Sequence, residues 1–272
     1  MTELCFNTMN RSAYLLGDED PDLEGQIDAA AKAGFSCFGP DSYSIADYVA
    51  RGGSRESLAE RIEAAGLRVF ELPTLGFDHD AEASRANIDE MLTNVRVFRP
   101  DFVQVNVTSD IDDAIVDAFR RAGDVFGAEG ASLAVEYLPW LPAIRDIEST
   151  RGLLDRAAVP GAGVLVDSWH FSFGDDTWAI LEGLPLGEIA YVQFDDHPPL
   201  QSDDLVDETL RRRVMPGSGQ LELARFCEVF RAKGYTRPVS CEVLSDATRQ
   251  MDRLEFARQL YTSCRRFWPE AG

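Results

Sequence analysis

The sequence predicts an α/β protein with the (β/α)8, or TIM barrel, fold, built as a single domain over residues 1–272. Short apolar runs alternate with helical patterns from end to end, and the pair recurs eight times at a period of about 30 residues. The length is close to the roughly 250 residues that are typical of such a barrel. No linker, low-complexity stretch or long charge run divides the chain, so we expect one domain.

The first half of the chain is expected to contain four strands and three helices. We expect strands at residues 4–7, 35–38, 67–72 and 102–107, and helices at 23–32, 55–65 and 81–98. Gly34 stops the first of these helices, Ser54 offers an N-cap for the second, and Pro100 closes the third.

The second half repeats this alternation. We expect helices at 112–126, 147–158, 177–184, 221–233 and 246–267, and strands at 132–136, 164–167, 189–194 and 239–243. A long polar loop at 195–219 precedes the helix at 221–233. A doubly wound open sheet is the alternative. The strand count and the lack of a Gly-x-Gly-x-x-Gly turn after the first strand argue against it.

Composition excludes several classes of partner. The net charge of −21 repels phosphate backbones and anionic lipids, so we expect neither nucleic acid nor membrane as a partner. The basic cluster at 211–213 is too small for a nucleic-acid footprint, although it could hold one anionic or hydroxyl-rich substrate. The five scattered cysteines show no Cys-x-x-Cys spacing, and neither a basic leader nor a long apolar span is present. We therefore expect a soluble, cytoplasmic protein.

Oxygen-bearing side chains occur where four consecutive strands are expected to end. The carboxyl ends of all strands face one rim of a barrel, and residues there line the active site. An unpaired buried carboxylate costs several kcal/mol, so a positive charge must compensate these groups. One divalent cation, Mn²⁺, Mg²⁺ or Co²⁺, suits such oxygen ligands. The alternative is that each acid pairs with an arginine or with backbone amides. The predicted metal ligands are Glu136, Asp167, Gln193 and Glu242.

These positions resemble the xylose isomerase-like TIM barrels, the sugar phosphate isomerase/epimerase family. In that family, glutamates at the ends of the fifth and eighth strands bind one divalent metal. The sixth strand carries Asp-x-x-His, and the seventh usually supplies a histidine. Here Glu136, Asp167, His170 and Glu242 match in place and order, whereas Gln193 stands where the histidine is usual. The resemblance covers the whole predicted barrel.

Two further features bear on the branch of the family. The stretch from Arg213 to Gly219 is similar to the family's Arg-x-x-Pro-Gly-x-Gly loop. Glutamine at the seventh strand resembles the arrangement of some bacterial 3-dehydroshikimate dehydratases. In the D-tagatose 3-epimerase branch a second glutamate follows six residues after the first, and here that place is Pro142. Both differences weaken an assignment to free-sugar epimerisation.

The resemblance implies a metal-dependent isomerase or epimerase that removes a proton next to the carbonyl of a small polyhydroxy-ketone, either a sugar or a cyclitol. The first alternative is a dehydratase, a carbon–oxygen lyase acting on 3-dehydroshikimate or an inosose. The second is a non-catalytic barrel that serves as a partner subunit. An endonuclease of this fold would need a histidine-rich zinc site and a basic groove, which three histidines and a charge of −21 do not supply. By analogy with the family we expect a homodimer.

The resemblance also assigns roles within the site. Glu136 or Glu242 would double as ligand and base, and His170 would donate a proton or clamp a substrate oxygen. Arg213 would hold a carboxylate or hydroxyl at the far end of the substrate.

Three other residues are weaker candidates for substrate contacts. His79 lies in the loop after the third strand and Glu71 at the end of that strand, while Trp140 follows the fifth strand. A solvated histidine and an ordinary packing aromatic are the alternatives for His79 and Trp140. After Gln193, His197 either lines the site or belongs to a mobile lid.

Overall fold

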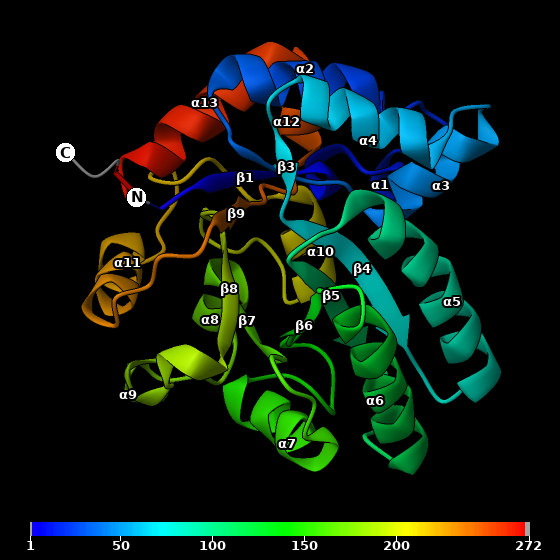
Figure 1. The fold of residues 1–272 in the computed structure, drawn as a ribbon. Helices are drawn as coiled ribbons and strands as arrows, with labels where there is room; N and C mark the ends of the chain where they lie inside the picture. Colours follow the sequence, from blue (N-terminus) through cyan, green and yellow to red (C-terminus); the bar gives the residue numbers. More distant parts are fainter. Residues whose placement is uncertain (1, 270–272) are drawn as a thin grey trace.

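The computed structural model describes residues 2–269 and has the predicted barrel. Its nine parallel strands form one sheet in the order β3-β2-β1-β9-β8-β7-β6-β5-β4, curled into a nearly closed barrel with helices on the outside (Figure 1). The strands are β1 (Leu4–Asn7), β2 (Cys37–Gly39), β3 (Arg68–Val69), β4 (Glu71–Phe77), β5 (Phe102–Val107), β6 (Ser132–Glu136), β7 (Gly163–Asp167), β8 (Ile189–Phe194) and β9 (Val239–Cys241).

The ninth strand arises because the predicted third strand is divided in two. β3 pairs with β2 and β4 pairs with β5, and Phe70 joins them. The amide of Phe70 donates to the Phe38 carbonyl at 3.1 Å, while its own carbonyl accepts from the Phe102 amide at 3.0 Å. The second piece also runs five residues beyond the predicted end. Pro73 has no amide hydrogen to donate, and the register of β4 against β5 shifts there, between Leu72 and Leu75, instead of the strand ending.

The helices that cover the barrel begin and end largely where expected. They are α2 (Leu23–Ala33), α4 (Arg55–Ala64), α5 (Ala81–Phe98), α6 (Asp113–Gly127), α7 (Ile147–Ala157), α9 (Trp178–Gly183), α11 (Leu223–Ala232) and α13 (Arg253–Arg265). The Ser54 side chain accepts from the Ser57 amide at 3.1 Å and so caps α4. Gly34 ends α2 with φ of 105°, a conformation that favours glycine. Among residues 2–269, no helix is long and apolar enough to cross a membrane.

Short helical segments occupy the loops, mostly at the carboxyl ends of the strands. The sequence did not predict them, except that the segment at 246–249 opens the predicted helix at 246–267. The predicted loop at 195–219 contains one of them, and the predicted helix at 246–267 is broken at residues 250–252. The break follows from Asp252, whose carboxylate caps α13 through the amides of Leu254 and Glu255, at 3.0 and 3.1 Å. The short helices are η1 (Thr8–Arg11), α1 (Ala13–Leu16), α3 (Ser42–Ala50), α8 (Ser168–Phe173), η2 (Leu186–Glu188), α10 (Leu205–Arg211) and α12 (Asp246–Arg249).

The interior of the barrel is filled in layers. Alternate residues of each strand point inward, as the two-residue period of a strand requires. A compact apolar cluster of the strands includes Phe70, Phe102 and Tyr191, with ring centroids of Phe70 5.7 and 5.2 Å from the other two. Two residues further along β5 and β8, Gln104 and Gln193 are buried, and their side chains touch at 3.3 Å. Polar groups therefore begin directly above the apolar filling of the barrel.

Candidate active site at the carboxyl ends of the strands

A cavity of about 240 Å³ opens at the carboxyl ends of the strands. The strands contribute mainly polar groups to its wall, and the loops and short helices contribute most of the apolar and aromatic groups. Its lining residues are Met9, Tyr14, Tyr43, Thr74, Gly76, Gln104, Asn106, Thr108, Glu136, Leu138, Trp140, His170, Thr209, Leu210, Arg213, Glu242 and Leu244.

Glu136, the last residue of β6, is held by amides from the neighbouring strand. Its Oε2 atom accepts hydrogen bonds from Gln104 Nε2 at 2.6 Å and Asn106 Nδ2 at 2.7 Å. Its Oε1 atom lies 3.3 Å from His170 Nε2. Because two neutral donors already satisfy one oxygen, the other is left facing the imidazole inside the cavity.

Asp167 combines the two roles that the sequence left as alternatives. As the N-cap of α8, its Oδ1 atom accepts from the backbone amides of Trp169 at 2.6 Å and His170 at 3.3 Å. Its Oδ2 atom points toward the site, 2.9 Å from Arg213 Nη1 and 3.8 Å from His170 Nε2. Burial raises the pKa of this carboxyl, but Arg213 and His170 outweigh burial, so its pKa lies below the usual value.

Arg213 is the buried cation at the centre of these acids. Its Nη1 atom contacts Asp167, Asp195 and, at 3.3 Å, Glu242 Oε2. Its Nε and Nη2 atoms donate to the hydroxyl of Thr209 at 3.1 and 2.8 Å. Burial opposes the charge, yet the three carboxylates hold the pKa of Arg213 above its ordinary value. Protein groups thus occupy the donors that the sequence assigned to substrate, which makes Arg213 a residue that positions the acids.

Glu242 lies just beyond β9 and is also buried. Its Oε1 atom accepts from Asn7 Nδ2 at 3.2 Å, and Asn7 is fixed in that orientation because its own oxygen accepts from the Met9 amide at 2.8 Å. Burial raises the pKa of Glu242 well above its usual value; Arg213 opposes this effect, and Glu136 adds to it. A carboxylate with a raised pKa is suited to accepting a proton.

One group of side chains could hold a metal ion. Single ligand atoms of Glu136, Asp167 and His170 lie within 4.8 Å of one another, and all three residues are buried. Two carboxylates and an imidazole form a donor set that several divalent transition metals accept. Glu242, which the sequence placed among the ligands, is not part of this group and pairs with Arg213. His170 belongs to the group in its place.

The fourth predicted ligand, Gln193, has its amide at the same place. Its side-chain oxygen faces acceptors alone, 2.9 Å from Glu136 Oε1 and 3.3 Å from Asp167 Oδ2. Two arrangements resolve this contact: the amide turns over so that its nitrogen donates to both carboxylates, or a cation lies among the three oxygens. The Nε2 atom of His170 faces the same point, 3.3 Å from Glu136 Oε1 and 3.8 Å from Asp167 Oδ2. The residues present therefore fit a metal ion.

Two other predicted site residues lie away from the cavity. Glu71 is fully buried at the first residue of β4, because that strand continues to Phe77 and leaves Glu71 inside the barrel and not at its rim. There it accepts from Ser240 Oγ and from Cys5 Sγ, and burial raises its pKa to about 7. The His79 side chain is 66% exposed and lies 3.9 Å from Asp112.

The structure also shows where Trp140 and His197 lie relative to the cavity. Trp140 does line the cavity, with its ring centroid 5.4 Å from that of His170. His197, by contrast, is buried behind the site, where its ring contacts the carbonyls of Pro198 at 2.6 Å and Glu208 at 3.3 Å. It forms part of the packing behind the cavity.

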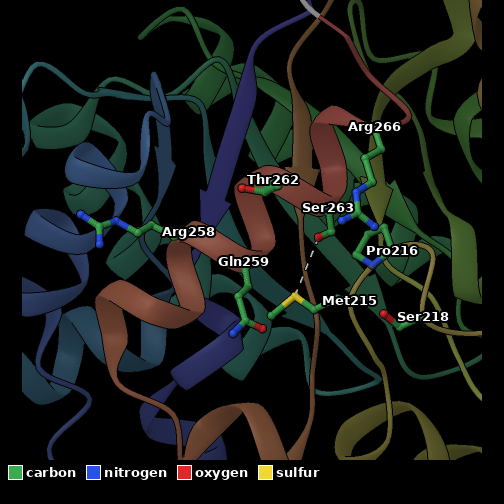
Figure 2. Close-up of a pocket in the computed structure, with 8 residues that line it drawn as sticks. All are labelled: Met215, Pro216, Ser218, Arg258, Gln259, Thr262, Ser263 and Arg266. Carbon is green, nitrogen blue, oxygen red and sulfur yellow. Dashed lines mark hydrogen bonds between the residues drawn. The ribbon is translucent and has the colours of Figure 1, made fainter.

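The Arg-x-x-Pro-Gly-x-Gly loop is divided between two places. Arg213 points into the cavity, whereas the next residues run along the outside of the barrel beside α13, where Met215 accepts from Ser263 Oγ at 3.9 Å (Figure 2). Asp196 holds this turn, accepting from the amides of Gly217 and Gly219 at 2.9 and 2.8 Å. A Cβ at position 219 would lie 2.5 Å from the His197 carbonyl oxygen, so the glycines serve the turn.

Several lining residues were not predicted. Tyr14 and Tyr43 come from the short helices α1 and α3, and their ring centroids are 5.1 Å apart at the mouth of the cavity. No periodicity marks helices this short. Gln104 and Asn106, in contrast, alternate with valines in β5, and this polar–apolar alternation was a signal that could have placed them inside the barrel.

Comparisons with known proteins agree with this architecture. The family model described as "Xylose isomerase-like TIM barrel" matches residues 27–260. A 3-dehydroshikimate dehydratase of Pseudomonas putida is 31% identical over 148 residues, which is 54% of this chain and 23% of that protein. The corresponding protein of Pseudomonas aeruginosa is 31% identical over 136 residues, 50% of this chain and 21% of its own length. The match thus spans under a quarter of these curated relatives.

Solved structures share the fold at low sequence identity. The IOLI protein, whose crystal structure has a binding zinc atom, superposes with a TM-score of 0.84 at 18% identity over 98% of both chains. A D-allulose 3-epimerase from Methylomonas sp. in complex with D-allulose has a TM-score of 0.75 at 13% identity, over 97% of this chain and 96% of its own.

Proposed function

Because the chain belongs to the xylose isomerase-like TIM barrel family, we propose that it is a divalent-metal-dependent enzyme that removes a proton next to the carbonyl of a small polyhydroxy-ketone. One observation carries the proposal. Glu136 and His170 line a cavity of about 240 Å³ together with Glu242, and the buried Asp167 completes the metal-binding group behind this wall. A cavity of this size suits a compact sugar or cyclitol.

Glu136, Asp167 and His170 would hold the metal, with the Gln193 oxygen as a fourth donor. A divalent ion here would supply Lewis-acid stabilisation of the negative charge that develops on the substrate oxygen. Mn²⁺, Mg²⁺ and Co²⁺ remain our proposal for the ion, and Zn²⁺ suits the imidazole ligand equally well.

Glu242 is the proposed base. It lines the cavity beside the metal group, and its two oxygens are oriented by Asn7 and Arg213. Its burial favours the protonated form after the transfer, which helps it to accept the proton from carbon. The positive charge of Arg213 is shared among Glu242, Asp167 and Asp195, so it does not stabilise the ionised form of Glu242 alone.

Isomerisation or epimerisation follows if the proton returns to carbon, and we propose this outcome first. Loss of water from the same enolate is the second candidate. One observation favours it: curated relatives at 31% identity are 3-dehydroshikimate dehydratases. The departing hydroxyl would take up the proton that Glu242 removed from carbon, because His170 Nε2 is assigned to the metal. We further propose that a homodimer in the cytoplasm is the working form, with no nucleic-acid or membrane partner.

Proton NMR in D₂O tests this proposal. The Mn²⁺-free, Mg²⁺-loaded protein is incubated with 3-dehydroshikimate, an inosose and several ketohexoses. We expect deuterium to enter next to the carbonyl of at least one of them, with isomers as products of the first outcome and a conjugated or aromatic product of the second. Glu242→Gln should slow the exchange by about 100-fold or more, since general-base catalysis contributes that much. If no compound exchanges, or if Glu242→Gln exchanges at the wild-type rate, the proposal fails.

A further inference from the structure

A second cavity adjoins the candidate active site. It has a volume of about 320 Å³ and lies between α3 and α5, over β4. Tyr43, Thr74 and Gly76 line both cavities, so the two spaces adjoin at these three residues. The wall on the far side comes from residues of α5, among them Asn87 and Asn94.

The shared wall connects the two spaces chemically. The Thr74 hydroxyl hydrogen-bonds the side chain of Asn106, which in turn donates to Glu136 in the candidate active site. The Thr74 carbonyl accepts from Ser42 Oγ at 3.0 Å on the other side. At Gly76, an added Cβ would meet nothing within 4 Å, so the strand leaves open space where it passes between the cavities.

Most of the polar side chains that line the second cavity are uncharged. Asn94 is only 2% exposed; its oxygen accepts from Arg55 Nε at 2.7 Å, and its amide nitrogen has no partner among residues 2–269. The acid in this wall, Glu90, is already paired with Arg55. This paired acid and the strongly acidic protein disfavour an anionic ligand, whereas the Asn94 amide nitrogen, which has no acceptor among the described residues of the protein, can donate to a hydroxyl oxygen in the cavity.

We propose that this α3–α5 cavity is a second substrate subsite, which takes an uncharged, hydroxyl-rich extension of the keto-polyol that reacts in the first cavity. The inference rests on the proposed function and names its substrate class: a polyhydroxy-ketone bearing a neutral substituent such as a glycosyl group. Tyr43 borders both cavities, and its ring offers a face on which a sugar ring stacks.

Binding measurements separate this inference from the reaction itself. Isomaltulose carries a glucosyl group on a fructose unit, and D-fructose is the same ketose without it. Their dissociation constants are measured by calorimetry on the Mg²⁺-loaded protein. The variant Ala46→Leu fills the second cavity from the exposed face of α3. The control is Ala50→Leu, which adds the same side chain one turn later on α3, at an exposed residue that does not line the cavity.

We expect the wild type to bind isomaltulose about tenfold or more tightly than D-fructose, because two or more added hydrogen bonds favour the larger ligand. Ala46→Leu should abolish that preference and leave the affinity for D-fructose unchanged, while Ala50→Leu keeps the preference. Equal binding of both sugars to the wild type, no binding of either, or a preference that survives Ala46→Leu overturns the inference. If isomaltulose binds as expected but no compound exchanges deuterium, the proposed function fails and the subsite stands.

Discussion

The two halves of the barrel rim handle buried polar groups in different ways. Over β6 to β9, three carboxylates gather around one buried guanidinium, that of Arg213. Over β1 and β2, the buried carboxylate of Asp41 is satisfied by neutral donors alone: its oxygens accept from the hydroxyls of Thr8 and Ser12 and from the Ser44 amide. Asp41 also caps α3 in this way.

This difference separates the tasks of the two halves. A fully hydrogen-bonded N-cap such as Asp41 is structurally complete and offers little to a metal or a substrate. The acids of the other half keep oxygens that face one another or His170, and their charges depend on a single arginine. We therefore propose that the reaction takes place in the half formed by β6 to β9, and that the half carrying Tyr14, Tyr43 and Thr74, which also line the cavity, recognises much of the substrate.

The largest effect is expected at Arg213, because its removal leaves three buried carboxylates without a cation. Arg213→Met should lower the free energy of unfolding by about 3–5 kcal/mol. Arg211→Met is the control: that side chain is 58% exposed and pairs with Asp207 at 2.9 Å, so its loss should cost about 0–1 kcal/mol. Urea denaturation at pH 7 measures both. Similar losses in the two variants would contradict the role given to Arg213.

A smaller and pH-dependent effect is expected at Glu71, which lies inside the barrel without a cation. Its pKa is raised to about 7 from its usual value of 4.5, so the folded protein holds a proton that the unfolded chain releases between these values. The protonated side chain therefore contributes to the free energy of unfolding. This contribution is present in full below about pH 4.5 and is lost as the pH rises through about 7, which lowers the free energy of unfolding by a value on the order of 3 kcal/mol.

Glu71→Gln cannot ionise and removes that pH-dependent cost. The stability of the variant relative to the wild type should therefore increase from pH 4.5 to 7 and level off above that. Denaturation curves across this range measure the difference directly. A difference that stays constant with pH would show that Glu71 is ionised in the folded protein throughout the range, contrary to this account.

The sequence predicted the side chains over β6 to β9 better than those in the half of the rim that carries Asp41, Tyr14 and Tyr43. Glu136, Asp167 and Glu242 each interrupt or end an apolar strand, and that local pattern is enough to place a side chain at the rim. Tyr14 and Tyr43 lie on short helices that only the folded loops define. Glu71 was placed at a strand end because the third strand was expected to stop at residue 72, whereas the backbone continues as a strand through Pro73.

The position of Arg213 required the fold itself. Its partners Asp167, Asp195 and Glu242 are 46, 18 and 29 residues away in the chain, and no local pattern reports contacts between residues so far apart. The sequence argument that some positive charge must compensate the acids was sound in its physics, and the structure supplies part of that charge from the protein.

The most direct test of the central claim is a calorimetric titration of Mn²⁺ into the wild type, Glu136→Gln and Asp41→Asn. The claim is that the half formed by β6 to β9 holds the metal. We expect the wild type and Asp41→Asn to bind one ion with similar affinity, and Glu136→Gln to bind it about 100-fold or more weakly, since altering even an outer partner of a ligand costs 10–100-fold. Equal affinity in all three proteins, or a loss confined to Asp41→Asn, would contradict the account.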